Sequence, residues 1–272
     1  MSNETPPSSQ VLLITGASSG IGAATARAAS AAGWRVVLAA RSRDRLRALA
    51  DDLGGEERAL AVTCDVTDWD AQQRMVEAAL SAFGQLDAAF ANAGFGGARG
   101  FLADTPEHWR EMVLTNVYGA ALTLRATIPA LKQSRGHLLL TSSVAGRRVL
   151  PGSLYSCTKH AVTAMGEAAR QDLHGTGIRV TLIEPGITDT PFFDRRPGEA
   201  LRDQDIARGA VRDLTAAARR RQRDPHPPER PAGLEPARRT EPLASPVTGC
   251  AGGLAPNLFV GSGARKNFFA AS

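Results

Sequence analysis

The chain has 272 residues, which suits one α/β domain with a full hydrophobic core and leaves room for a tail. Hydrophobic residues make up 43% and charged residues 22%, which is ordinary for a soluble globular protein. The formal net charge of +5 lies wholly in residues 209–272, which carry ten Arg or Lys against five Asp or Glu. Because residues 1–208 are neutral overall, we expect no nucleic-acid partner.

Short apolar runs alternate with helical patterns along most of the chain. Residues 1–9 come first; they are polar and rich in Pro and Ser, and we expect a disordered lead. The apolar runs predict strands at Val11–Thr15, Val36–Ala40, Leu60–Cys64, Leu86–Ala91, His137–Thr141 and Ile178–Ile183. The helical patterns lie between them, in a first helix that ends near Ala32 and then at Arg43–Leu53, Met75–Phe83, Pro106–Leu131 and Ser153–Leu173.

This alternation predicts the fold class. Buried strands that take turns with helices require a parallel sheet covered on both faces. A helical bundle is the alternative, but runs such as Val36–Ala40 and Val180–Ile183 have the length of strands and are bounded by Gly and polar residues. We therefore expect residues 10–208 to form one catalytic domain with a doubly wound, Rossmann-type α/β fold.

The character of the sequence changes at Gly209. Eight of the sixteen prolines lie between Pro225 and Pro256, and no helical or strand periodicity is evident after Gly209. We expect residues 209–272 to be an atypical basic, Pro-rich tail. Our hypothesis for its origin is a shift of reading frame near Arg208–Gly209, because a back-translation of Arg220–Pro228 read one nucleotide later gives a strand-like segment. The rival, a basic arm for nucleic acid or membrane, fits less well because the arginines lack interleaved aromatic residues.

Neither a membrane span nor a metal site is predicted. The longest apolar runs, such as Val36–Ala40, are far too short to cross a bilayer, and no basic segment precedes an apolar stretch as in a signal peptide. Cys64, Cys157 and Cys250 show no metal-ligand spacing. We interpret them as reduced thiols of a cytoplasmic protein.

A glycine-rich turn follows the first predicted strand. Gly16, Gly20 and Gly22 lie where that strand passes into the first helix. Glycine permits a tight turn and lets backbone N–H groups touch a pyrophosphate, and the helix N-terminus offers further N–H groups to phosphate. The position of the turn near the N-terminus favours a dinucleotide over an ordinary loop.

The segment Thr15-Gly16-Ala17-Ser18-Ser19-Gly20-Ile21-Gly22 resembles the glycine fingerprint of the short-chain dehydrogenase/reductase family. The resemblance covers roughly residues 10–208, and its further motifs follow in chain order as Asp65-Val66, Asn92-Ala93-Gly94, Asn116, Tyr155-Ser156-Cys157-Thr158-Lys159 and Pro185-Gly186. It implies that these residues surround a nicotinamide dinucleotide, with Asp65 and Val66 at the adenine, Asn92 and Gly94 at the ribose, and Thr190 at the carboxamide. A helix-capping role is the alternative for Asp65.

The end of the second strand indicates the choice of cofactor. NAD-preferring members of the family have an acid there, whereas this chain has Ala40 followed by Arg41. Arg binds a phosphate with two parallel hydrogen bonds, which a carboxylate would repel. We therefore expect NADP(H); a solvated loop charge is the alternative for Arg41.

Tyr155 and Lys159 are spaced i and i+4, so they share one face of the Ser153–Leu173 helix. Their proximity, together with the nicotinamide cation, should lower the tyrosine pKa toward neutrality and make it a proton donor and acceptor. The resemblance implies that Asn116 holds a water connecting the lysine to solvent; the other interpretation of Asn116 is a local helix bend, and we expect both.

A serine after the fifth strand should polarise the substrate oxygen. Counting back from Tyr155 points to Ser142, whereas counting forward along the strand points to Ser143. We favour Ser143 because strand register is costly to change and a loop can lose a residue.

The sequence thus predicts an NADP-dependent oxidoreductase that acts on a carbonyl/alcohol pair, without metal. Phe95, Leu150, Phe192 and Phe193 suggest an apolar substrate. The resemblance implies a homodimer or homotetramer, which an altered tail would weaken. The alternative function is an NADP-binding protein whose catalysis is impaired by that tail.

Overall fold

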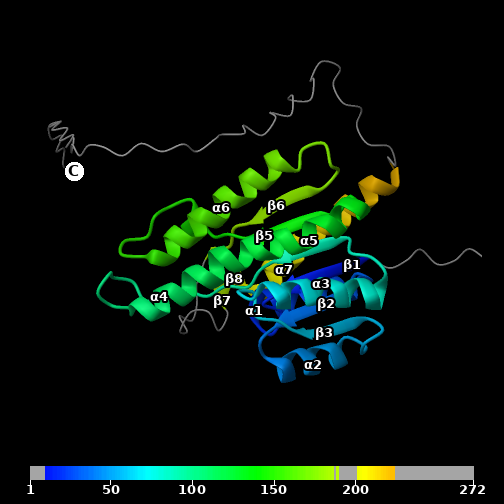
Figure 1. Cartoon of the computed structure of the whole chain (residues 1–272), viewed down its shortest axis with the longest axis horizontal. Helices are drawn as coiled ribbons and strands as arrows, with labels where there is room; N and C mark the ends of the chain where they lie inside the picture. Colours follow the sequence, from blue (N-terminus) through cyan, green and yellow to red (C-terminus); the bar gives the residue numbers. More distant parts are fainter. Residues whose placement is uncertain (1–9, 187, 190–200, 224–272) are drawn as a thin grey trace, which may run out of the picture. The chain divides into compact units, whose positions relative to one another are not determined.

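The computed structural model describes residues 10–186, 188–189 and 201–223. Its main sheet is parallel and six-stranded, in the order β3-β2-β1-β4-β5-β6. These strands are β1 (Val11–Thr15), β2 (Arg35–Ala40), β3 (Ala59–Thr63), β4 (Ala88–Ala91), β5 (His137–Thr141) and β6 (Arg179–Ile183). The doubly wound fold expected from the sequence is confirmed (Figure 1).

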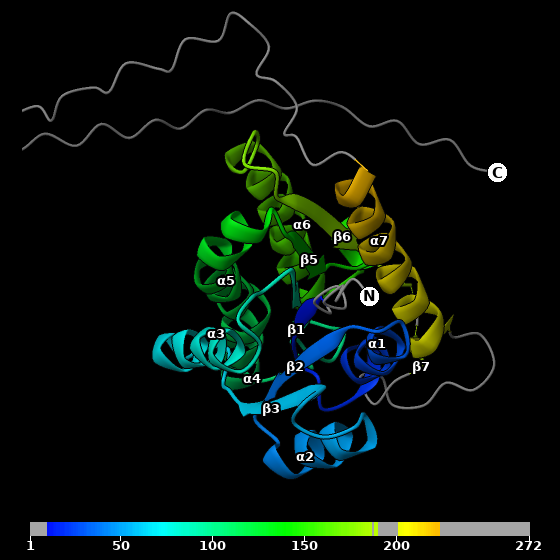
Figure 2. The same ribbon diagram turned by 90° about the vertical axis from the view of Figure 1, so that its right-hand side faces the viewer.

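Helices cover both faces of this sheet. They are α1 (Gly20–Ala31), α2 (Arg43–Asp52), α3 (Trp69–Phe83), α4 (Pro106–Val113), α5 (Ala120–Ser134), α6 (Leu154–Asp172) and α7 (Asp203–Arg223). α1 and α7 lie on one side of the sheet, and α3, α5 and α6 on the other (Figure 2). Successive residues of β1 serve opposite faces: Leu13 packs in the cluster with α3, α5 and α6, whereas Leu12 and Ile14 pack in the cluster with α1, α2 and α7.

The strand order reverses direction at β1. The chain runs outward from β1 through β2 to β3, then returns to place β4 on the other side of β1. At such a switch point the loops that leave neighbouring strands diverge and open a crevice at the carboxyl ends of the strands. The glycine-rich turn after β1 and the segment after β4 therefore border the same crevice.

The expected long helix over Pro106–Leu131 is divided. α4 continues into a π-helix at Leu114–Gly119 (η1), and α5 follows it directly. Asn116 lies within the π-helix and is 1% exposed. A wider π turn lets a polar residue turn its amide inward, where it bonds to other segments and not to its own helix.

The sequence-based expectation that helical periodicity ends at Gly209 was wrong. α7 passes through Gly209 and ends at Arg223. Its buried residues Ala207, Ala210, Val211 and Leu214 follow helical spacing, and the helix packs against α1 and β5. Small alanines among charged residues give little contrast in the sequence, so the pattern escaped detection. The predicted tail therefore begins inside a packed helix, and residues 224–272 lie outside the described part of the chain.

Two short strands, β7 (Thr188–Asp189) and β8 (Leu201–Arg202), pair in parallel ahead of α7. Within the described residues, no helix is long and apolar enough to cross a membrane.

Two substitutions in α7 test whether this helix belongs to the folded core. Leu214→Ala removes a side chain that is 1% exposed, so the free energy of unfolding should fall by about 2–5 kcal/mol. Gly209→Ala adds a methyl group that meets nothing within 4 Å, and it should raise that free energy by about 0.5–1 kcal/mol because alanine favours helix. Urea unfolding followed by circular dichroism measures both. If neither variant differs from wild type, α7 is not part of the cooperative unit.

Candidate active site

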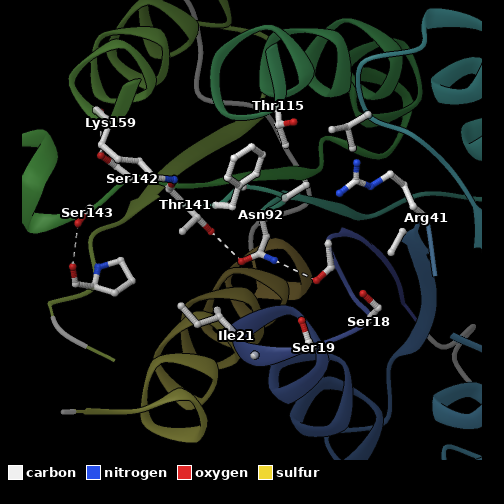
Figure 3. Close-up of a pocket in the computed structure, with 18 of the residues that line it drawn as sticks. Ser18, Ser19, Ile21, Arg41, Asn92, Thr115, Thr141, Ser142, Ser143 and Lys159 are labelled. Carbon is white, nitrogen blue, oxygen red and sulfur yellow. Dashed lines mark hydrogen bonds between the residues drawn. The ribbon is translucent and has the colours of Figure 1, made fainter. Parts of the chain in front are cut away.

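A pocket lies at the carboxyl ends of the strands, and it brings together most of the residues predicted from the sequence (Figure 3). The predicted residues that line it are Gly16, Ser18, Ser19, Gly20, Ile21, Arg41, Asp65, Val66, Asn92, Ala93, Gly94, Phe95, Ser142, Ser143, Tyr155, Lys159, Pro185 and Gly186. Gly22 and Asn116 lie directly behind its wall. Thr190 falls outside the described residues.

The glycine-rich turn is held against the segment after β4. Gly16 has a φ of +68°, and a Cβ there would come within 2.8 Å of the Cα of Ala93. A Cβ at Gly22 would overlap the carbonyl oxygen of Gly16. Only glycine allows this approach of turn, strand and helix.

The N-terminus of α1 fits an anion. Among the described residues, Ser19 at the N-cap makes no side-chain capping hydrogen bond, and the first turn of α1 contains no acid. The N–H groups of that turn therefore remain for an external acceptor, and the helix dipole favours negative charge there. This geometry suits the pyrophosphate of a dinucleotide.

Asn92 joins the ends of three strands. Its backbone N–H donates to the hydroxyl of Thr15 (3.0 Å), and its side-chain amide donates to the carbonyl of Thr15 (3.0 Å). Its side-chain oxygen accepts from the hydroxyl of Thr141 at 3.0 Å, as Figure 3 shows. The turn after β1 is thereby tied to the ends of β4 and β5.

Arg41 and Asp65 line the end of the pocket beside β2 and β3. Asp65 accepts hydrogen bonds from the N–H (2.9 Å) and hydroxyl (2.8 Å) of Thr67. Burial favours a higher pKa for Asp65, but these two bonds and the charge of Arg41 outweigh it and hold the pKa below its ordinary value. The helix cap of α3 is Asp68, whose carboxylate accepts from the N–H of Ala71. Asp65 therefore shapes the loop that faces the pocket, and the capping role belongs to Asp68.

Tyr155 and Lys159 come from the first turns of α6, as their spacing predicted. The ammonium of Lys159 lies 5.6 Å from the centre of the Tyr155 ring and donates to the carbonyl of Thr141 at 2.8 Å. Lys159 is 3% exposed. Burial lowers the pKa of Lys159 to about 8, because the charged form loses its water.

The pKa of Tyr155 moves in the direction opposite to the one expected. Burial raises it to about 12, and the hydrogen bond with Ser143 offsets only part of this rise. The expectation counted a cofactor cation in addition to Lys159; from the chain's own groups, desolvation of the phenolate dominates. At neutral pH the phenol is consequently protonated, which is the form that donates a proton.

The two candidate serines point to different surroundings. Ser143 hydrogen-bonds Tyr155, and its hydroxyl also donates to the carbonyl of Pro185 at 3.3 Å. Ser142 is 1% exposed and bonds to the backbone of Lys159 (3.2 Å) and the hydroxyl of Thr163 (2.6 Å). The geometry thus favours Ser143 as the serine that meets a substrate, while Ser142 connects β5 to α6.

Asn116 uses its amide to hold the wall of the pocket. It donates to the carbonyl of Phe95 (2.9 Å) and to the hydroxyl of Thr158 (3.1 Å), and it accepts from the N–H of Phe95 (3.0 Å). Thr158 precedes Lys159 on α6. Asn116 therefore fixes the position of a pocket residue and of the helix that carries the lysine; the expected water is a separate prediction.

Several residues with a clear role at the site were missed from the sequence. Thr141 receives the ammonium of Lys159 and donates to Asn92, and Thr15 accepts from both Asn92 and Ala93. Both threonines end predicted strands, and that position was the signal available. Phe95, by contrast, was predicted from the sequence to meet an apolar substrate, and it lines the pocket.

The sequence of this chain is similar to those of known oxidoreductases. The model of short chain dehydrogenases matches residues 10–199. Serine 3-dehydrogenase of Agrobacterium fabrum is 37% identical over 213 residues, covering 76% of this chain and 84% of the relative. An uncharacterized oxidoreductase of Staphylococcus haemolyticus is 37% identical over 214 residues, covering 77% of this chain and 92% of the relative.

Solved structures agree with this result. An alcohol dehydrogenase from Thermococcus sibiricus, complexed with 5-hydroxy-NADP, superposes with a TM-score of 0.70 at 33% identity, covering 76% of this chain and 90% of that one. A 3-ketoacyl-(acyl-carrier-protein) reductase from Brucella melitensis, complexed with NADH, gives a TM-score of 0.72 at 30% identity and covers 76% and 92%.

The buried ammonium makes stability depend on pH. Because the pKa of Lys159 is about 8 in the folded protein against an ordinary 10.5, the unfolded chain binds more protons between these values. Wild-type stability should therefore gain on the order of 3 kcal/mol from this group as pH rises through that window. Lys159→Met removes the effect, so the variant should be the more stable protein at pH 7, and its advantage should shrink toward pH 10.

Chemical unfolding of both proteins at several pH values measures the difference. Lys132→Met, which changes an exposed lysine of α5, is the matched control and should track wild type. An advantage of the Lys159 variant that is independent of pH would contradict a lowered lysine pKa.

Proposed function

The chain belongs to the short chain dehydrogenase family, and on that premise we propose that it transfers a hydride between NADP(H) and a carbonyl/alcohol substrate. The observation that carries the proposal is one hydrogen bond and its setting. The Tyr155 phenol bonds to Ser143 beside the buried ammonium of Lys159, in a pocket that also contains an N-terminal helix turn suited to phosphate.

The preference for NADP(H) is supported by the end of β2. Ala40 and Arg41 line the pocket there. The adenosine ribose of a bound cofactor would therefore meet a cation at the position where a carboxylate would favour NAD. The Thermococcus sibiricus relative is complexed with 5-hydroxy-NADP. When bound, NADP(H) supplies or accepts the hydride.

Protons and orientation come from the chain itself. Ser143 presents a hydroxyl to the substrate oxygen, next to the protonated phenol of Tyr155. As negative charge develops on that oxygen during reduction, Tyr155 donates its proton and Ser143 stabilises the remaining charge. Lys159, held by the carbonyl of Thr141, stabilises the phenolate that results.

An apolar substrate fits the described part of the pocket. Phe95 lines it, and the N–H of Gly100 bonds to the carbonyl of Gly152 at 2.9 Å, joining the segment between β4 and α4 to the segment that precedes α6. Phe192 and Phe193, also predicted for this region, lie outside the described residues. A cytoplasmic location and assembly into a homodimer or homotetramer are part of the same proposal.

Tyr155→Phe tests the catalytic assignment. Loss of the phenolic proton should lower turnover by about 10²–10⁴-fold, since general acid catalysis contributes that much. NADPH oxidation with a panel of ketones and aldehydes measures turnover, and fluorescence titration shows that the cofactor still binds. Tyr118→Phe, at the other tyrosine of the chain, is the control and should retain activity. If wild type binds NADPH but is as inactive as Tyr155→Phe, the impaired NADP-binding protein is the correct function.

Arg41→Ala tests the choice of cofactor. Removing a charge-assisted contact to the extra phosphate should raise KM for NADPH by about 10- to 100-fold, the effect of a hydrogen bond to a charged group. KM for NADH should change little, because NADH lacks that phosphate. Steady-state kinetics with both cofactors gives the comparison, and Arg43→Ala serves as the control. Equal effects on NADPH and NADH would refute the assigned role of Arg41.

A further inference from the structure

A buried glutamine connects two walls of the pocket. Gln72 lies in the first turn of α3 and is 0% exposed. Its amide nitrogen lies within hydrogen-bond distance of the carbonyl of Val66 (2.9 Å), the hydroxyl of Thr123 (2.9 Å) and the carbonyl of Gly119 (3.2 Å), three acceptors that share its two N–H groups. Burying an amide costs free energy unless it is hydrogen-bonded, so these partners fix the position of the Gln72 side chain.

The first of these partners belongs to the adenine side of the proposed dinucleotide site. Val66 follows Asp65 and lines the pocket. The Gln72 bond to its carbonyl holds this loop from behind. A dinucleotide that contacts Asp65 and Val66 therefore meets a loop whose backbone is anchored to α3.

The second partner belongs to the catalytic side. Gly119 is the last residue of the π-helix that carries Asn116. Its carbonyl also accepts from the hydroxyl of Thr123 at 2.9 Å. The π-helix lies directly against the loop that contains Asp65 and Val66. A Cβ added to Gly119 would come within 2.6 Å of the Val66 side chain. In the middle of the π-helix, Asn116 holds both backbone groups of Phe95.

We propose that Gln72 is a positioning residue that couples binding of the adenosine part of the cofactor to the placement of Asn116 and Phe95. The inference rests on the proposed NADP(H) site. A shift of the Val66 loop pulls on the same amide that supports Gly119, so the π-helix must adjust with it. Coupling of this kind requires a shared, fully packed element, and one buried amide provides it.

The test is hydrogen exchange of the full chain, followed by mass spectrometry, with adenosine 2′,5′-bisphosphate as the probe. This fragment reaches the adenosine end only. In wild type it should slow exchange in residues 65–66 and, through Gln72, in Leu114–Gly119 by about fivefold or more, the lower end of couplings between sites. In Gln72→Met, which keeps a long side chain but no donor, protection should persist at 65–66 and disappear at Leu114–Gly119.

Two further variants sharpen this test. Thr123→Val removes one hydroxyl partner of Gln72 but leaves the carbonyls of Val66 and Gly119 as acceptors of its amide, so both regions should stay protected. If Gln72→Met does not fold, Gln72→Glu, which keeps one donor when its carboxyl is protonated, should show partial coupling.

The remaining outcomes separate the two ideas. Protection of Leu114–Gly119 that survives in Gln72→Met, or that is missing in wild type while 65–66 is protected, overturns the role of Gln72 and leaves the cofactor site standing. A wild-type protein in which the probe protects neither region overturns the proposed cofactor site itself.

Discussion

The site depends on the hydrogen bonds that Asn92 makes across the strand ends. At a switch point the strands to either side send their loops in opposite directions, and nothing in the sheet ladder itself holds those loops together. Asn92 bridges them by bonding to Thr15 on one side and Thr141 on the other. The carbonyl of Thr141 then accepts a hydrogen bond from Lys159, so one continuous set of bonds runs from the glycine-rich turn to α6. The same residues therefore position both the glycine-rich turn, proposed to bind phosphate, and the helix that carries Tyr155 and Lys159.

Burial explains the electrostatics of this arrangement. Lys159 and Tyr155 both lie where their charged forms lose water, which lowers the lysine pKa and raises the tyrosine pKa. Each group is consequently closer to neutral than it would be in solvent. In the proposed reaction, a charge that develops on a substrate oxygen would be poorly screened there, so the Tyr155 proton and the Lys159 ammonium would act on it strongly.

The features predicted well from the sequence were those that local chemistry determines. Apolar runs of strand length marked the sheet, and the glycines after β1 and the spacing of Tyr155 and Lys159 marked the pocket. Features that depend on tertiary contacts escaped. The buried amide of Gln72 reflects neighbours distant in sequence, and so does the π form of the helix bend that was expected at Asn116. α7 was missed because two of its four buried residues are alanine and charged residues surround them. The direction of the tyrosine pKa differed from the expected one because its dominant cause is burial, which the sequence did not reveal.

We propose that this pocket directs hydride transfer to a carbonyl carbon, and an isotope label on the cofactor follows that transfer. NADPH deuterated at one face of the nicotinamide C4 is incubated with the protein and a reducible ketone, followed by the opposite diastereomer, and the alcohol is analysed by mass spectrometry. We expect deuterium on the carbinol carbon from one diastereomer only, because a cofactor in the proposed site would be held in one orientation. Alcohol that contains no deuterium from either, or deuterium equally from both, would contradict it.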